Sequence, residues 1–254
     1  KEYKAKRVKM PDNFYEQILL VKGLLKEFGV PILEKEGYEA DDLIGSVVEK
    51  LKDEDVEIFI ITGDLDTLQL VNDKVFVYTL RQGLRDTIIY DKEKIRERFQ
   101  LEPSQLVDWK ALRGDPSDNV PGVPAIGEKT AQELIKNFHS LDNLYEQLKN
   151  FSSVQEFIAK NPKVKISSRV FKNLKDFEDQ AYFSRHLVLI ERQAPLDFHL
   201  AAAEFQIPDK EKLENSLNKL GFKSLIPKIF GATKVKTLEQ TEESLAIINV
   251  FSDL

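Results

Sequence analysis

The sequence contains no cysteine, and that absence removes several kinds of chemistry at once. Disulfide frameworks, thiolate metal sites and cysteine nucleophiles are excluded. Histidine is nearly as scarce, because only His139, His186 and His199 occur and they lie far apart in the chain. A histidine-based zinc site is therefore not expected, and any catalysis must use carboxylates, hydroxyl groups, lysine and arginine.

The sequence also lacks long apolar runs and an excess of basic charge. No run is long enough to cross a membrane and no signal peptide is visible, so no membrane partner is expected. The formal net charge of −6 argues against a generally basic surface. With 254 residues, of which 42% are hydrophobic, the chain can form a sizeable core and two domains. Because it starts with Lys1 and not methionine, we expect a fragment or an incompletely ordered chain.

Residues 56–70 predict a buried strand that ends in two acids. Its first residues are mostly apolar and a turn-forming Thr-Gly pair follows them, which is typical of a parallel strand buried on both faces. Asp64 and Asp66 come next, at the strand end where ligands bind in open α/β sheets. A bound cation would offset their charge. The simpler alternative is that both are ordinary turn residues.

A second group of acids opens a predicted helix. Apolar residues from Leu43 onward recur at helical spacing, which places Glu39, Asp41 and Asp42 in the first turn. Acids there can cap free N–H groups and interact favourably with the helix dipole. Three acids this close repel one another, however, which is more than capping requires. A short strand at 31–33 precedes the helix, and the strand–helix–strand order predicts a parallel βαβ unit.

A third acidic group contains Asp115 and Asp118, within the run Gly-Asp-Pro-Ser-Asp-Asn at 114–119. An ordinary turn is an equally good interpretation of these residue types.

The loop that follows, residues 120–127, feeds a helix whose free N–H groups can bind an anion. Gly122 and Gly127 permit close approach, and Lys129 and Thr130 can contact phosphate directly. A Walker-type loop is excluded because no buried strand precedes this segment. We favour binding of a phosphodiester backbone over the alternative, a simple helical hairpin turn.

Carboxylates that converge without histidine or cysteine suit hard divalent cations, chiefly Mg²⁺ or Mn²⁺. Two such ions about 4 Å apart can activate a water molecule and stabilise the leaving oxygen of a phosphoryl displacement. The residues alone therefore predict metal-assisted phosphodiester hydrolysis. The acids expected to converge are Glu39, Asp41, Asp42, Asp64, Asp66, Asp115 and Asp118.

The remaining sequence predicts the organisation of the chain. The basic run at 1–10 is either a solvated end or a phosphate-contacting segment with Tyr3 as a stacking surface. A hairpin of strands is expected at 75–90, and the pattern after residue 115 is mainly helical. We predict an α/β core over 1–112, a helical DNA-binding subdomain over 113–230, a linker over 231–244 and the first strand of a following domain over 245–254. Helices are expected over 12–28, 39–51, 91–99, 103–112, 127–138, 141–148, 154–158, 166–177, 181–190, 209–220 and 225–230.

Five short motifs, taken in order, resemble the 5′-nuclease domain of bacterial DNA polymerase I, in the flap-endonuclease superfamily. Each is weak alone, but together they are highly specific and the similarity spans roughly residues 1–230. They are Tyr-Lys-Ala-Lys-Arg at 3–7, Gly-Tyr-Glu-Ala-Asp-Asp at 37–42, Thr-Gly-Asp-Leu-Asp at 62–66, Gly-Asp-Pro-Ser-Asp-Asn at 114–119 and Pro-Gly-Val-Pro-Ala-Ile-Gly-Glu-Lys-Thr-Ala at 121–131.

The resemblance implies an α/β fold with a mainly parallel central sheet flanked by helices, PIN-like or resolvase-like, and a helical C-terminal subdomain containing a helix–three-turn–helix element. It implies a structure-specific 5′-3′ exonuclease and flap endonuclease that removes 5′ flaps and RNA primers from branched duplex DNA. The parent chain would be a monomeric DNA polymerase I in the bacterial cytoplasm, with a polymerase domain in the same chain, acting in replication and repair.

The resemblance also implies roles for single residues. Glu39, Asp41 and Asp42 would serve one metal ion, Asp64 would lie between the two ions, and Asp66, Asp115 and Asp118 would serve the second. Lys4 and Arg7, next to Tyr3, would be catalytic residues at the foot of a helical arch. A K⁺ ion could bind to carbonyl groups of the helix–three-turn–helix element. The residues expected to contact DNA are Tyr3, Lys4, Arg7, Gly122, Val123, Ile126, Gly127, Lys129 and Thr130.

Two departures from the family pattern matter. A first strand with a metal-binding aspartate, and a second acidic position, should precede Lys1, and without them we expect poor folding or little activity. Ala125 stands where the hairpin commonly has glycine, which would affect the approach to DNA.

Two alternatives remain open. A haloacid-dehalogenase-type phosphatase would use Asp64 as a covalent nucleophile, but its acidic motif should follow a buried strand and the segment before Gly114 reads as a helix. The other alternative is a DNA-binding fragment with an incomplete metal site.

Overall fold

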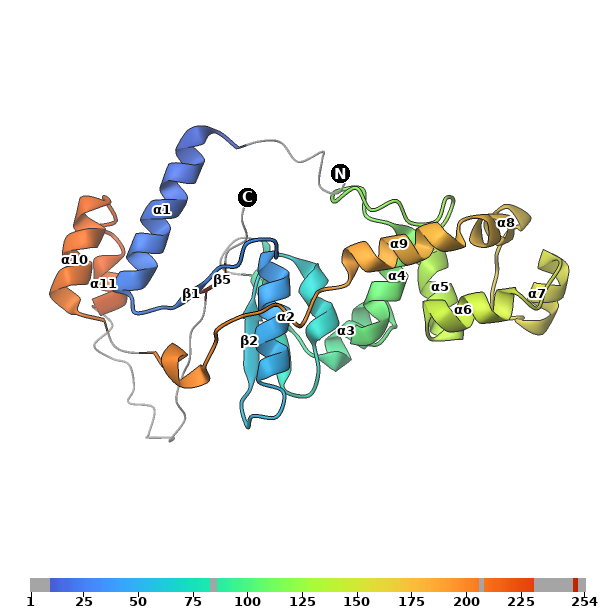
Figure 1. Ribbon diagram of the computed structural model, residues 1–254, viewed down its shortest axis with the longest axis horizontal. Coiled ribbons are helices and arrows are strands. Elements are labelled where there is room, and N and C mark those ends of the chain that lie inside the picture. The colour runs from blue at the N-terminus through green and yellow to red at the C-terminus, as the bar shows by residue number, and fades with distance from the viewer. Residues whose placement is uncertain (1–9, 83–85, 206–207, 231–248, 251–254) are drawn as a thin grey trace. The chain divides into compact units, whose positions relative to one another are not determined.

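A computed structural model of the chain describes residues 10–82, 86–205, 208–230 and 249–250 (Figure 1). These residues form two compact units. The first unit is the described part of Val48–Arg192, and the second combines the described parts of Lys9–Val47 and Gln193–Leu254. The units interleave along the chain, so compact units and consecutive domains need not coincide, and the domain boundaries stay a prediction.

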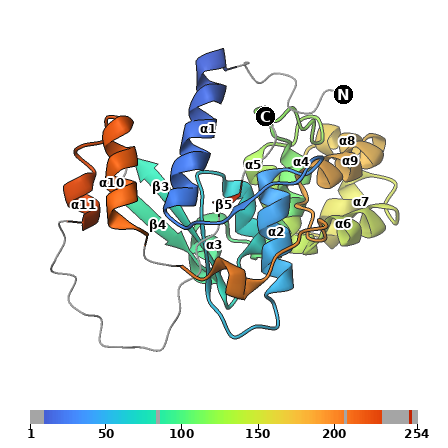
Figure 2. The same ribbon diagram turned by 60° about the vertical axis from the view of Figure 1, so that its left-hand side comes forward.

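The sheet of the first unit is mixed. β2 (Ile58–Ile61) pairs in parallel with β3 (Val75–Gln82), and β3 pairs antiparallel with β4 (Asp86–Tyr90), side by side in Figure 2. The predicted hairpin is therefore confirmed. A mainly parallel sheet was expected, and the described strands differ in one respect: the β3–β4 pairing is antiparallel, while the β2–β3 pairing and that of β1 (Ile32–Leu33) with β5 (Asn249–Val250) are parallel.

The prediction that β2 is buried on both faces is wrong. The register aligns Ile60 with Val77 and Val77 with Tyr90, and this row is buried, with 5%, 0% and 2% exposed. Phe59 and Ile61 point to the other face and are 50% and 76% exposed. Successive side chains of a strand alternate between faces, so the apolar run alone could not show that only one face is covered.

The short strand at 31–33 is confirmed as β1 (Ile32–Leu33), but it does not join β2. It pairs in parallel with β5 (Asn249–Val250), in a separate two-stranded sheet. The predicted βαβ unit is therefore not formed as one sheet within the described ranges. The order of elements in the sequence shows how the strands are connected. It does not show which strand lies beside which, because a strand can pair with a segment that is remote in sequence.

The helices of the first unit agree with the prediction to within about three residues. Their N-termini follow from local chemistry: Asp91, Ser140, Ser153 and Ser167 each accept a hydrogen bond from the amide three residues later. A one-turn helix, Pro103–Gln105, begins with a proline and lies between α3 and α4. The helices are α3 (Lys92–Phe99), α4 (Leu106–Arg113), α5 (Glu128–Phe138), α6 (Leu141–Leu148), α7 (Val154–Lys160), α8 (Ser168–Asp176) and α9 (Glu178–Val188).

Helix α4 lies at the centre of this helical part. It contacts both α5 and α9, and Ala111 and Leu112 are fully buried. Leu134 and Ile135 of α5 are fully buried as well. The core therefore holds α4, and with it the loop that follows, in a fixed position.

The second unit contains α1 (Asp12–Glu27), β1, the start of α2 (Ala40–Lys50), α10 (Lys210–Lys219) and α11 (Ile226–Phe230), with a one-turn helix at Leu200–Ala203. Gly29 follows α1 with φ 70°, a conformation that glycine adopts without strain. Ser46 Oγ donates to the Asp42 carbonyl oxygen at 2.7 Å and accepts from the Ala194 amide at 2.9 Å. The predicted linker at 231–244 lies outside the described residues.

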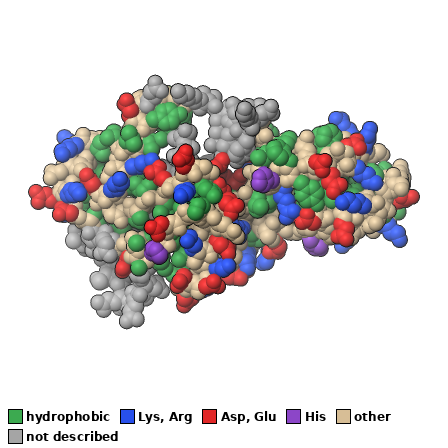
Figure 3. All heavy atoms as spheres, in the orientation of Figure 1, with side chains coloured by type: hydrophobic (Ala, Val, Ile, Leu, Met, Phe, Trp, Pro, Cys, Tyr) green, Lys and Arg blue, Asp and Glu red, His purple; other side chains and the backbone are tan. Residues whose placement is uncertain are grey.

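Acidic and basic side chains are interspersed on the face shown in Figure 3, in keeping with the modest net charge. Among the described helices, none has both the length and the apolar character needed to span a membrane.

Candidate functional site

A cleft in the first unit gathers four of the seven predicted metal ligands. It has a volume of about 570 Å³. The end of β2 and the helical turn after it supply two acids, and the loop after α4 supplies two more. The acids that line it are Asp64, Asp66, Asp115 and Asp118.

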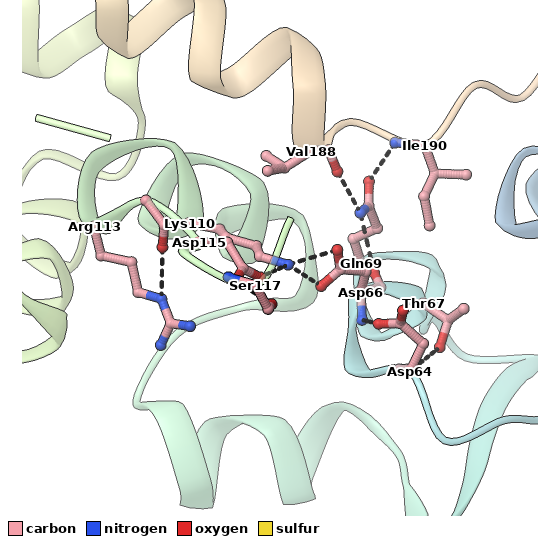
Figure 4. A network of polar contacts seen from close by, with 11 residues as sticks. Asp64, Asp66, Thr67, Gln69, Lys110, Arg113, Asp115, Ser117, Val188 and Ile190 are labelled. Carbon is pink, nitrogen blue, oxygen red and sulfur yellow. Dashed lines mark hydrogen bonds and ion pairs between the residues drawn. The ribbon is translucent and has the colours of Figure 1, made fainter. Parts of the chain in front are cut away.

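Asp64 and Asp66 are held by a tight turn that the sequence analysis did not predict. A 3-10 helix spans Leu65–Leu70, and the Asp64 carboxylate caps it by accepting from the Asp66 amide at 2.9 Å. Thr67, fully buried, donates from Oγ1 to the Asp64 carbonyl oxygen at 2.9 Å. The simpler interpretation of Asp64 as a turn residue is therefore partly correct, while the same turn directs Asp66 into the cleft (Figure 4).

The ammonium group of Lys110 lies between Asp66 and Asp115 (Figure 4). Lys110 Nζ contacts both Asp66 carboxylate oxygens, Oδ2 at 2.6 Å, and Asp115 Oδ2 at 2.7 Å. Burial raises the pKa of Asp66, and Lys110 only partly opposes this. Burial also acts to lower the pKa of Lys110, but the two carboxylates outweigh it and raise that pKa. Lys110 is therefore charged in this cluster.

Asp115 is the more strongly ionised acid of the pair. Burial acts to raise its pKa, but hydrogen bonds from Lys110 and Ser117 outweigh this and hold the pKa well below its usual range. The Ser117 amide donates to Asp115 Oδ1 at 2.9 Å. The Asp115 backbone exchanges hydrogen bonds with Val120 at 3.0 and 2.8 Å. The loop thus holds a charged carboxylate facing the cleft.

The other three predicted ligands belong to the second unit. Asp42 Oδ2 accepts from the Glu39 amide at 3.0 Å, so Asp42 serves as a helix cap, and Asp41 lies in the first turn of α2. Within the described residues, no group of three or more histidine, cysteine or acidic side chains is arranged to hold a metal ion. The convergence of all seven acids therefore stays a prediction. Tyr3, Lys4 and Arg7 lie outside the described residues.

The glycine-containing loop is packed against α9. A Cβ atom on Gly122 would lie 2.6 Å from Gly114 Cα and 2.7 Å from the Arg113 carbonyl carbon. The Gly122 amide donates to Ser184 Oγ at 3.0 Å, and Gln180 Nε2 donates to the Gly122 carbonyl oxygen at 2.6 Å. Close backbone approach here serves internal packing, in addition to any role in binding DNA.

The predicted DNA contacts divide into buried and exposed residues. Val123 and Ile126 are 2% and 4% exposed, so their side chains belong to the core. Gly127 is the N-cap residue of α5 and no side chain caps that helix start, while Lys129 is exposed and Thr130 half-buried. Gly127, Lys129 and Thr130 are therefore the predicted contacts that a phosphate can reach.

Ala125 has φ 64°, in the left-handed region. Glycine adopts that conformation with less strain than alanine does.

Two polar residues at the cleft escaped the sequence analysis. Lys110 gives only a weak signal, because it lies between the apolar residues Trp109 and Ala111 in a helix that also contains the charged residues Asp108 and Arg113. Gln69 gives no such signal. Its side chain Nε2 donates to the carbonyl oxygens of Asp66 and Val188, each at 3.0 Å, and Oε1 accepts from the Ile190 amide at 3.1 Å.

Replacing Gln69 with leucine should lower the free energy of unfolding by about 2 kcal/mol, because buried backbone groups at Val188 and Ile190 would lose their partners. Urea denaturation measures the change. Gln155→Leu is the matched control, since Gln155 is exposed on α7, and it should stay within about 0.5 kcal/mol of the wild type. Equal losses in the two variants would show that Gln69 does not tie the acidic turn to α9.

Two domain models of one protein family match the chain in succession. The model of the 5′-3′ exonuclease N-terminal resolvase-like domain matches residues 1–100, and the model of the 5′-3′ exonuclease C-terminal SAM fold matches residues 101–211. The chain belongs to the 5′-3′ exonuclease family. The resemblance found in the sequence is confirmed, and so is the resolvase-like fold with a helical C-terminal part. The phosphatase alternative is wrong, and α4 is indeed a helix where that family needs a strand.

Curated relatives of this family member are similar over nearly the whole chain. DNA polymerase I of Caldicellulosiruptor bescii is 38% identical over 251 residues, which cover 98% of this chain and 28% of that protein. DNA polymerase I of Bacillus subtilis is 36% identical over 250 residues, covering 98% and 26%. The chain thus spans about a quarter of the length of these relatives.

Solved structures share the fold of this chain at lower identity. T5 5′-exonuclease with bound zinc is 22% identical, covers 90% of this chain and 77% of that chain, and has a TM-score of 0.59. The catalytic core of Rad2 in complex with a DNA substrate is 21% identical, covers 87% and 68%, and has a TM-score of 0.55.

Proposed function

We propose that this member of the 5′-3′ exonuclease family is a structure-specific nuclease that hydrolyses phosphodiester bonds near the 5′ ends of flaps and RNA primers on duplex DNA. It would work as part of a DNA polymerase I, as the names of its curated relatives suggest. The observation that carries the proposal is the cleft in which acids from two separate motifs lie around one ammonium ion.

The donor set of this cleft fits hard divalent ions. Its lining supplies carboxylate oxygens and lacks histidine and cysteine, and oxygen ligands suit Mg²⁺ or Mn²⁺. Asp66 and Asp115 already hold one cation, Lys110. The T5 neighbour is described with divalent metal ions, which supports the same use here.

Each acid then has a role in the proposal. Asp64, Asp66, Asp115 and Asp118 would bind metal from the cleft. Glu39, just before α2, and Asp41 and Asp42 in its first turn stay predicted metal ligands. Bound divalent ions supply an activated water molecule and stabilise the leaving oxygen. The chain itself orients the acids through the turn at Leu65–Leu70 and the Asp115–Val120 bridge.

The DNA backbone would meet the uncapped start of α5. Amides at a helix start attract phosphate, and Lys129 adds a positive charge beside it. Glu128 opposes anion binding, although Arg113 lies 3.6 Å from its carboxylate. A predicted K⁺ ion at this loop would have to share the carbonyl oxygens of Gly122 and Pro124, which accept hydrogen bonds from Gln180 and Asn173.

Cleavage of a labelled 5′-flap duplex by the intact protein tests the proposal. With Mg²⁺ or Mn²⁺ we expect product released from the 5′ strand, and with a chelator none. Duplex binding without cleavage, under every divalent ion tried, would overturn the nuclease proposal and favour the DNA-binding fragment instead.

Replacing Lys129 with alanine should weaken binding to duplex DNA roughly five-fold at about 0.1 M salt, because one phosphate contact is lost. The slope of log affinity against log salt concentration should fall by about 1. Titration by fluorescence anisotropy at several salt concentrations measures both. Lys52→Ala, which also removes an exposed lysine, should leave the slope unchanged, and a parallel change in both variants would remove Lys129 from the interface.

A further inference from the structure

Lys110 is largely buried, although lysine side chains usually face solvent. Its side chain is only 13% exposed, and it lies on α4 between the buried residues Trp109 and Ala111. A buried ammonium group is costly unless carboxylates compensate it. The fold therefore holds a positive charge at the wall of the acidic cleft.

The ammonium group uses the oxygen atoms that a metal ion would need. It contacts both carboxylate oxygens of Asp66, and Asp115 Oδ2 at 2.7 Å. Asp115 Oδ1 accepts from the Ser117 amide and hydroxyl. Oxygen ligands of hard divalent ions must lie close to the ion, so a metal cannot take Asp66 and Asp115 as ligands while Lys110 stays between them.

We propose that Lys110 is a built-in competitor that occupies the Asp66–Asp115 pair until a divalent ion displaces its ammonium group, and so sets the metal affinity of the cleft. The proposal rests on the proposed function, because it takes Asp66 and Asp115 as metal ligands. The competition is between two cations for the same oxygen atoms. Lys110 is thus a positioning residue that keeps the two acids together before metal enters.

The helix limits how far the lysine can retreat. Ala111 and Leu112 are fully buried, so α4 itself cannot shift without opening the core. Release of the ammonium group must therefore occur by rotation of the flexible side chain. A metal-loaded protein should present Lys110 to solvent more openly than the metal-free protein.

Calorimetric titration with Mn²⁺ tests the competition. Lys110→Met removes the charge and keeps the length of the side chain, and it should bind Mn²⁺ at least ten-fold more tightly than the wild type. Lys94→Met also removes one positive charge, but Lys94 is half-exposed and pairs with Glu97, so its affinity should stay within two-fold. Equal affinity of Lys110→Met and the wild type, or weaker binding by a folded Lys110→Met protein, would overturn the proposal.

A second measurement on the wild type does not depend on the variant folding. Amine-reactive labelling, read by mass spectrometry, should modify Lys110 at least five-fold faster with saturating Mn²⁺ than without, while Lys94 stays constant. Unchanged or slower labelling of Lys110 would contradict displacement.

Asp66→Asn separates the two proposals. If it binds Mn²⁺ as the wild type does, the metal site of the proposed function fails. If it loses Mn²⁺ binding while Lys110→Met matches the wild type, the site stands and only the competitor role of Lys110 fails.

Discussion

An Asp66→Asn variant should cleave a 5′-flap duplex at least about 100-fold more slowly than the wild type. Even outer partners of metal ligands typically contribute 10–100-fold, and a direct ligand of a catalytic ion should contribute more. Asp66 lines the cleft together with acids from a second motif and already contacts a cation. Single-turnover cleavage with Mg²⁺ measures the effect.

The stability of the same variant distinguishes a metal ligand from a structural acid. The amide keeps an oxygen atom that can accept from Lys110, and Asp115 still compensates the ammonium group, so the variant should stay folded and lose about 2 kcal/mol or less of unfolding free energy. Asp73→Asn is the matched control: Asp73 is 87% exposed and pairs only with Lys92 in the described contacts. Wild-type cleavage by Asp66→Asn would remove Asp66 from the mechanism.

Replacing Gly122 with alanine should lower the free energy of unfolding by about 3 kcal/mol or more. The new Cβ would overlap backbone atoms, Gly114 Cα at 2.6 Å and the Arg113 carbonyl carbon at 2.7 Å. Gly122 also has φ 61°, which costs an alanine roughly 1 kcal/mol. Backbone atoms cannot rotate away as a side chain can, so the loop must shift. Urea denaturation and duplex binding should both report the loss.

Gly63→Ala is the control for this second variant. Nothing lies within 4 Å of a Cβ built there, and its φ is not positive, so we expect a change within about 0.5 kcal/mol. A loss below 1 kcal/mol in Gly122→Ala would mean that the contact between the two loops is softer than the backbone distances indicate.

The helices could be predicted because their signals are local. Asp91 and Ser140 are residue types that cap helices, they stand directly before Lys92–Phe99 and Leu141–Leu148, and each caps its helix. The sheet could not be predicted to the same degree. The apolar sequence of residues 58–61 is the same whether one or both faces of the strand are buried. The strand that pairs with β1 lies near the other end of the chain, so no local signal identifies it.

The candidate site was predictable in its acids and not in its other members. Asp64 and Asp66 follow a strand, and Asp115 and Asp118 follow a helix, and both pairs line the cleft. Lys110, by contrast, was missed because an ordinary lysine on a helix faces solvent. Its position depends on which face of α4 the core covers, and that is decided by packing against α5 and α9.

The spacing of the contacts along helix α9 restricts insertions and deletions in this helix. Gln180 and Ser184 bind Gly122, and the carbonyl oxygen of Val188 accepts from Gln69; these contacts recur every four residues along one side. A single inserted residue would rotate everything after it by 100° and advance it by 1.5 Å. Deletions and insertions in α9 should therefore be tolerated far less well than changes of residue type on its opposite side.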